Sequence, residues 1–301
     1  MENQVNLSAD LSLSKIVHGQ MRLPEWNLNV EQRVDLLNQL LELGITSIDQ
    51  ADIYGNYTSE TLLGEAFREA PNLKEKFTVI SKCGIALKSN KFPDRAIKHY
   101  NYSADYIISS VENSLKNMHL NRLDLLLLHR PSPLLQPAEV AKAFAQLKQQ
   151  GKVNHFGISN FLPHQINALK AHLNVPLVTN QIELNPLQLE HFDNGNLDFC
   201  LEHQMHPMAW SPLAGGRIFK PKTEQEQRVI QVINEVAKAH DIEDPSQVIY
   251  AWILKHPSQP VITVGTGKQT RLKTAMQALN INLTNEDWFK IYTASTGVRV
   301  P

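Results

Sequence analysis

Eight short apolar segments recur along the chain, each bounded by Pro, Gly, Asn or charged residues, and this pattern predicts eight strands. The segments span residues 16–19, 45–49, 77–82, 123–129, 153–159, 177–183, 206–211 and 261–265. Residues 123–128 read Leu-Asp-Leu-Leu-Leu-Leu, a nearly continuous apolar run that is typical of a parallel strand buried on both faces. We therefore expect a parallel sheet whose faces are covered by helices.

Helical patterns fill the intervals between these segments. Apolar residues recur at spacings of three and four, and the resulting helices are expected at 34–41, 62–67, 107–115, 140–147, 228–240 and 246–255. The first strand leads into Gly19-Gln20-Met21-Arg22, which lacks the glycine pattern of an open dinucleotide-binding sheet. The sequence therefore predicts one α/β domain over residues 1–301, a closed (β/α)₈ TIM barrel.

Composition excludes several classes of function. The net charge of −1 comes with no basic cluster, so a nucleic-acid partner is not expected. Cys83 and Cys200 have no metal-ligand spacing and form no disulfide framework, which fits a reducing compartment. Residues 1–13 lack the pattern of a secretory signal, and no apolar run is long enough to span a membrane. We expect a cytoplasmic protein without a metal or a membrane partner.

Polar residues end three successive predicted strands. Asp49, Lys82 and His129 occupy these ends, and Tyr54 follows Asp49 by five residues. Because the strand ends of a barrel meet at one face, these side chains are expected to form an active site there. Each also has a structural interpretation: a solvated aspartate, a lysine or histidine at the rim, and a tyrosine ring that covers the core.

The chemistry of this group suggests proton delivery to a carbonyl oxygen. A tyrosine has a pKa near 10. A Lys82 ammonium beside Tyr54 is expected to favour the phenolate, while Asp49 keeps the lysine charged. His129 is expected either to donate a hydrogen bond to the substrate oxygen or to help relay the proton. Hydride is the expected attacking group at carbon. For Arg130, which follows the histidine, we expect a loop ion pair and no catalytic role.

At these motifs the chain resembles the aldo-keto reductases over nearly its whole length. Motifs that carry the resemblance lie in family order at residues 49–55, 81–82, 127–131, 151–161, 180–183, 210–216 and 265–271. The first reads Asp-Gln-Ala-Asp-Ile-Tyr-Gly and the third Leu-Leu-His-Arg-Pro. The resemblance implies that Asp49, Tyr54, Lys82 and His129 are the catalytic tetrad.

The resemblance also implies a nicotinamide cofactor. The implied contacts come from Ser159, Asn160 and Gln181 to the carboxamide, from Trp210 to the ring, and from Ser211, Leu213, Gly215 and Gly216 to the pyrophosphate. Gly265, Thr266, Gly267, Lys268 and Arg271 stand at a helix N-terminus, which is a natural anion site. Lys268 and Arg271 would hold the 2′-phosphate, so NADPH is preferred to NADH; the alternative is a basic, solvated helix start.

Three features depart from the family pattern. Thr274-Ala275 stand where many members carry Glu-Asn against the adenine, and Arg217 is unusual after the two glycines and is a candidate contact to the pyrophosphate. The first barrel strand begins close to the N-terminus, which is expected to leave little room for a hairpin beneath the barrel.

The resulting expectation is a monomeric carbonyl reductase that uses NADPH and takes a small-molecule aldehyde or ketone. Tyr54 is the expected proton donor, and Trp26, Tyr54 and His129 are expected to line the substrate pocket; alternatively, Trp26 packs on the rim. Two other functions stay open: a cofactor-sensing subunit of a larger assembly with slow reductase activity, and Schiff-base chemistry at Lys82.

Overall fold

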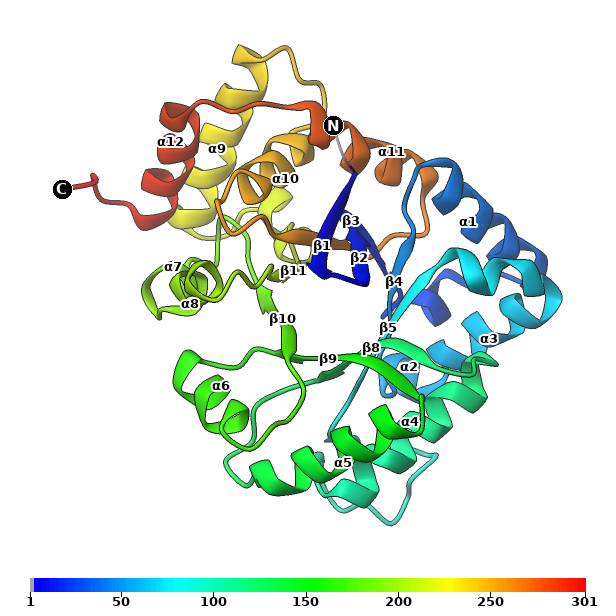
Figure 1. Cartoon of the computed structure of the whole chain (residues 1–301). Coiled ribbons are helices and arrows are strands. Elements are labelled where there is room, and N and C mark those ends of the chain that lie inside the picture. Colours follow the sequence, from blue (N-terminus) through cyan, green and yellow to red (C-terminus); the bar gives the residue numbers. More distant parts are fainter. Residues whose placement is uncertain (1–2) are drawn as a thin grey trace.

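Eight parallel strands close into a barrel in the computed structural model of the protein, which describes residues 3–301 (Figure 1). The strands are, in barrel order, β3 (Ile16–Gly19), β4 (Ser47–Asp49), β5 (Thr78–Cys83), β8 (Leu123–Leu128), β9 (Val153–Ser159), β10 (Leu177–Glu183), β11 (Met208–Trp210) and β12 (Val261–Val264). Closure comes from pairing of β12 with β3, in which Ile262 lies opposite Ile16. The predicted fold class is therefore confirmed, and all eight predicted strands form.

Helices form the outer ring of the barrel (Figure 1). They are α1 (Val30–Glu42), α2 (Tyr54–Tyr57), α3 (Ser59–Glu69), α4 (Ala104–Met118), α5 (Pro137–Gln149), α6 (Pro163–Lys170), α7 (Glu190–Asp193), α8 (Asn196–Glu202), α9 (Glu224–Ala239), α10 (Ser246–Leu254), α11 (Gln269–Gln277) and α12 (Asn285–Thr296). Helix α9 begins four residues before its predicted start, because Thr223 and Glu226 form a capping box there. Within residues 3–301, no helix combines the length and apolar character needed to cross a membrane.

Alternation along the strands decides which side chains reach the barrel interior. On β8, Leu126 and Leu128 pack in the cluster beneath the helices, whereas Leu125 and Leu127 belong to a second cluster together with Ile80 of β5. Because strand side chains alternate, the inward direction of Ile80 also applies to Lys82 two residues later. Cys83 consequently packs on the helix side, as its position beside Lys82 predicted.

An antiparallel hairpin, β1 (Gln4–Ser8) and β2 (Leu11–Ser14), lies across one end of the barrel (Figure 1). Its apolar residues, among them Val5, Leu11 and Leu13, join the interior cluster. The expectation that the chain lacks room for such a hairpin is wrong, because two strands of five and four residues with a tight turn fit before β3. The alternation of polar and apolar residues over this segment was the signal for it.

Candidate active site

Lys82 lies at the centre of a buried group at the ends of β4 and β5. Its Nζ donates to Asp49 Oδ1 at 2.7 Å, to the Gln50 carbonyl at 2.9 Å and to the Tyr54 hydroxyl at 3.0 Å. An ammonium has three N–H donors, so these contacts use all of them. Lys82 and Asp49 are 1% and 2% exposed. The ion pair is therefore dehydrated and its geometry is fixed by the two strands.

Burial and charge act in opposite directions on the two titratable partners. Burial lowers the pKa of Lys82, but the Asp49 carboxylate and the Tyr54 hydroxyl outweigh it, so the net pKa of Lys82 is raised. This lysine stays an ammonium, which disfavours Schiff-base chemistry because that chemistry needs a neutral amine. Burial raises the pKa of Tyr54, and the nearby Lys82 offsets this only in part. Lys82 thus acts in the expected direction, but the net pKa of Tyr54 is raised, so the expectation that the phenolate is favoured is not met and Tyr54 holds its proton.

His129 follows β8 and faces Tyr54 edge-on. The two ring centroids are 5.8 Å apart with an angle of 79° between the planes. Burial, followed by the positive charges of Lys82, Arg130 and Lys98, lowers the pKa of His129 well below its usual value. The imidazole is therefore neutral, and its Nδ1 atom is buried without a hydrogen-bond partner.

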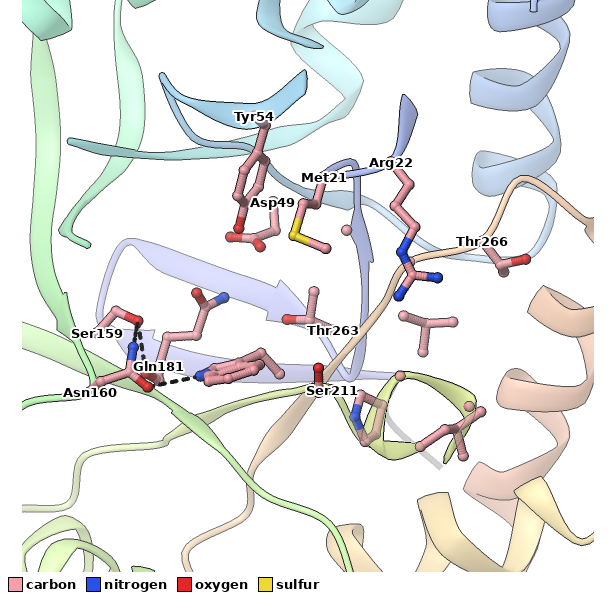
Figure 2. Close-up of a pocket in the computed structure, with 18 of the residues that line it drawn as sticks. Met21, Arg22, Asp49, Tyr54, Ser159, Asn160, Gln181, Ser211, Thr263 and Thr266 are labelled. Carbon is pink, nitrogen blue, oxygen red and sulfur yellow. Dashed lines mark hydrogen bonds between the residues drawn. The ribbon is translucent and has the colours of Figure 1, made fainter. Parts of the chain in front are cut away.

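A cavity of about 290 Å³ opens at this face of the barrel. Its lining contains these residues named from the sequence: Asp49, Tyr54, His129, Ser159, Asn160, Gln181, Trp210, Ser211, Leu213, Gly215, Gly216, Gly265, Thr266 and Arg271. Figure 2 shows Tyr54 and Asp49 on one side of the cavity and Ser159 and Asn160 across from them. Residues from almost every barrel strand therefore meet around one space.

Hydrogen bonds fix the side chains at the ends of β9, β10 and β11. The Asn160 amide donates to Ser159 Oγ at 2.7 Å, and Trp210 Nε1 donates to Asn160 Oδ1 at 3.0 Å (Figure 2). Gln181 Nε2 and Thr263 Oγ1 line the same cavity and are buried without a partner. An unsatisfied buried polar group costs roughly 1–3 kcal/mol, so these atoms favour a ligand with its own donors and acceptors. A carboxamide has both and fits this part of the cavity.

The segment after β11 exposes its backbone to the cavity. Ser211, Ala214, Gly215 and Gly216 all have positive φ, with values from 50° to 89°. Backbone N–H groups in such conformations form concave sites for anions, although those of Ala214 and Gly216 already donate to the Ser211 and Leu213 carbonyls at 2.8 Å. Arg217 points elsewhere: its Nε donates to Glu226 Oε1 of α9 at 3.0 Å, and the residue does not line the cavity. The structure thus gives no support to Arg217 as a cofactor contact.

The N-terminus of α11 provides a second site for an anion. Lys268 is its N-cap residue and provides no side-chain cap; the Arg271 N–H donates to the Lys268 carbonyl at 3.1 Å, which leaves the N–H groups of Gln269 and Thr270 available. No acidic residue lies in the first turn. Arg271 lines the cavity, whereas Lys268 is exposed outside it. The combination of a helix dipole and two basic side chains favours a phosphate group.

Trp26 does not line the cavity, so its expected place in the substrate pocket is wrong. The ring centroids of Trp26 and His18 are 5.7 Å apart. A Cβ at Gly267 would lie only 2.8 Å from Trp26 Cδ2. The glycine is therefore needed for the close approach of this loop. The alternative, that Trp26 packs at the rim, describes its position.

Eight lining residues were not assigned to the site from the sequence: Gly19, Met21, Arg22, Arg130, Pro212, Tyr250, Thr263 and Val264. Met21 and Arg22 follow β3; Met21 lies beside Asp49 and Tyr54, and Arg22 lies nearer to Thr266 (Figure 2). Their position after a strand was the available signal. Arg130 also lines the cavity, and its guanidinium lies 5.2 Å from the centroid of the Trp210 ring. The expected loop ion pair is wrong, since no carboxylate in residues 3–301 pairs with Arg130.

Comparison with known proteins identifies the family of the chain. Residues 15–295 match the family described as "Aldo/keto reductase family". The chain is 43% identical over 289 residues to oxidoreductase YdhF of Escherichia coli, covering 96% of this chain and 95% of that protein. It is 38% identical over 298 residues to a 6-dehydroglucose reductase of Agrobacterium fabrum, covering 99% of each.

A solved structure shares the fold. The glycerol dehydrogenase of Gluconobacter oxydans has a TM-score of 0.84 at 21% identity, over 99% of this chain and 98% of that chain. At this identity the likeness concerns the barrel alone. The family match and the relatives confirm the resemblance found in the sequence. The chain belongs to the aldo/keto reductase family of oxidoreductases.

Proposed function

We propose that the protein reduces small aldehydes or ketones to alcohols with NADPH, and that Tyr54 donates the proton. The observation that carries this proposal is the 3.0 Å contact from the Lys82 ammonium to the Tyr54 hydroxyl at the wall of the cavity. A protonated phenol beside a fixed positive charge is suited to give its proton to an oxygen that gains negative charge.

The lining residues fit the cofactor in two regions. Ser159, Asn160 and the unpartnered amide of Gln181 would hold the carboxamide, and Trp210 would stack on the ring. The positive-φ segment containing Gly215 and Gly216 would hold the pyrophosphate. Thr266, Arg271 and the N-terminus of α11 would hold the 2′-phosphate, with Lys268 at its outer edge. When bound, NADPH supplies the hydride that is added to the carbonyl carbon.

The protein side chains manage the proton and the charge. Neutral His129 donates its ring N–H to the carbonyl oxygen and polarises the bond. Tyr54 then transfers its hydroxyl proton to that oxygen, and the Lys82 ammonium stabilises the phenolate that remains. Asp49 keeps Lys82 charged and in place through the 2.7 Å contact. The alcohol thus gains its carbon-bound hydrogen from the cofactor and its hydroxyl proton from Tyr54.

Replacement of the phenol tests this proposal. Tyr54→Phe removes the transferable proton, so NADPH oxidation with a panel of carbonyl compounds should fall roughly 100-fold or more, while NADPH binding survives. The name of the Agrobacterium fabrum relative makes 6-dehydroglucose a suitable member of that panel. Tyr57→Phe is the matched control, because its hydroxyl bonds to Leu87 and Arg95 outside the cavity. Unchanged turnover in Tyr54→Phe would contradict the proposal.

The cofactor-sensing alternative predicts a different pattern. A wild-type protein that binds NADPH but reduces no member of the panel would support it. Sedimentation of the native protein in lysate with and without NADPH would then reveal a larger assembly. A free monomer with measurable turnover supports the reductase.

A further inference from the structure

We infer that His18, Gln20 and Gln50 are positioning residues whose buried hydrogen bonds couple the loop before α11 to the ammonium of Lys82. The inference rests on the proposed function, in which that loop holds the phosphate end of NADPH and Lys82 acts on Tyr54. None of the three side chains lines the cavity, so each acts through another residue.

The hydrogen bonds form one unbroken path through the barrel. His18 Nε2 lies 3.0 Å from the carbonyl oxygen of Thr266, and His18 Nδ1 lies 3.4 Å from Gln20 Nε2. Gln50 Nε2 donates to Gln20 Oε1 at 2.8 Å. The path ends at the Gln50 carbonyl, which accepts from Lys82 Nζ at 2.9 Å. Residues far apart in the chain thus connect the loop before α11 to Lys82, which contacts the proposed proton donor Tyr54.

The direction of the path is fixed by its ends. The Thr266 carbonyl can only accept, so His18 Nε2 carries the hydrogen and Nδ1 accepts from the Gln20 amide. Gln20 then accepts from Gln50 through its oxygen. Burial lowers the pKa of His18 to about 4, so the ring stays neutral and keeps this single tautomer. Each donor nitrogen in the path, on His18, Gln20 and Gln50, therefore meets an acceptor, whereas Gln50 Oε1 is buried without a partner.

Further bonds make the path rigid. His18, Gln20 and Gln50 are each 0–1% exposed. The Gln20 backbone N–H donates to the Asp49 carbonyl at 3.0 Å, and Ser59 Oγ donates to the Gln20 carbonyl at 2.8 Å. Removal of one member of a buried network leaves its neighbours without partners and lets them shift. A shift of Gln50 would move the carbonyl on which Lys82 depends.

A double-mutant cycle on NADPH affinity tests the coupling without turnover. His18→Phe keeps a planar ring but removes both polar atoms, and Lys82→Met removes the far end of the path. We expect each substitution to weaken NADPH binding and the combined effect to depart from the product of the single effects by roughly 3-fold or more. NADPH fluorescence gives the dissociation constants. If the fold-change in the dissociation constant of the double variant equals the product of the two single fold-changes, the inference is overturned.

Kinetics separate positioning from mere stability. In His18→Phe, kcat should fall roughly 10-fold. The descending limb of kcat at high pH should also move to lower pH, because a shift of Gln50 weakens the hydrogen bond from Lys82 Nζ to its carbonyl and so lowers the pKa of Lys82. His18→Gln, which keeps one donor and one acceptor, should recover part of this loss. The control Thr179→Val on β10 removes a partly buried hydrogen bond from the Thr179 hydroxyl to the His206 carbonyl and should leave the high-pH limb in place. An equal shift in the control would contradict the inference.

The outcomes remain distinguishable. If the wild type does not bind NADPH, both the proposed function and the inference fail. If it binds and reduces carbonyl compounds but the cycle shows no coupling, only the inference fails. Should His18→Phe not fold, Gln20→Met interrupts the same path and replaces it in both experiments.

Discussion

Lys82 illustrates how one residue links the stability of this barrel to its chemistry. Its ammonium is surrounded by one carboxylate, one carbonyl and one phenol, and water has no access to it. Loss of either charged partner leaves the other buried without compensation. The same contact that positions Tyr54 therefore also governs the free energy of unfolding.

A pair of variants separates these two roles. Lys82→Met should reduce kcat roughly 100- to 1000-fold and lower the free energy of unfolding by about 3–5 kcal/mol, because Asp49 stays buried and unpaired. Adding Asp49→Leu should restore most of the stability and none of the activity. Urea denaturation and initial rates check both effects. A double variant that is as unstable as Lys82→Met would contradict this explanation.

Burial of His18 should make the free energy of unfolding depend on pH. Its pKa in the folded protein is about 4, below the usual value of 6.5, because burial disfavours the charged ring. The unfolded chain therefore binds the proton first, and this contribution to stability is lost as pH falls below 6.5. The loss should reach roughly 2 kcal/mol near pH 5 and about 3 kcal/mol near pH 4.

The measurement compares the wild type with His18→Phe by urea denaturation, near pH 7 and near pH 5. The stability difference between the two proteins should narrow by about 2 kcal/mol at the lower pH, since only the wild type loses this contribution. Burial raises the pKa of Asp52 and Glu60, which has the opposite effect, but both proteins share it. A constant difference across this range would refute the assignment.

At the scale of elements, the segment between β11 and α9 depends on left-handed backbone. Gly216 has φ of 89° and a Cβ placed there would touch nothing within 4 Å. Its requirement for glycine is therefore conformational. The same holds for Gly151, with φ of 66° at the end of α5, which lies outside the cavity lining.

These two glycines form a matched pair. Gly216→Ala and Gly151→Ala should each lower the free energy of unfolding by roughly 1 kcal/mol, because an L-residue is strained at positive φ. Only Gly216→Ala should raise the KM for NADPH, since that segment would hold the pyrophosphate. Similar KM values in the two variants would argue against this use of the segment.

At the scale of the whole molecule, the two ends of the barrel have separate tasks. The hairpin of β1 and β2 covers one end, and the cavity lies at the other. Leu13→Ala should cost about 2–5 kcal/mol in stability, because this side chain is fully buried in the barrel interior, while kcat below the unfolding transition stays near the wild-type value. Thermal unfolding and initial rates at low temperature provide the check. A large loss of kcat would mean that the two ends are coupled.

Much of this arrangement could be predicted from local pattern. Strand ends that carry Asp49, Lys82 and His129 are visible in the sequence because apolar runs define the strands, and a barrel brings their ends together. Trp26 and Arg130 were misplaced because side-chain direction in a loop depends on neighbours such as Gly267 and Trp210, which are distant in sequence. The direction of the net pKa shift of Tyr54 was missed for a related reason. Sequence spacing shows that a positive charge lies nearby, but it does not show how deeply the hydroxyl is buried.

The pairing of β12 with β3 joins the last strand of the barrel to the first. Arg22 comes from the loop after β3 and Thr266 from the loop after β12, and both border the cavity. During synthesis, most of the chain must therefore emerge from the ribosome before the loops after β3 and β12 can come together at the cavity. Stabilisation of the fold by the proposed dinucleotide cofactor would accordingly begin only late in folding, and a nascent or truncated chain without β12 would not gain it.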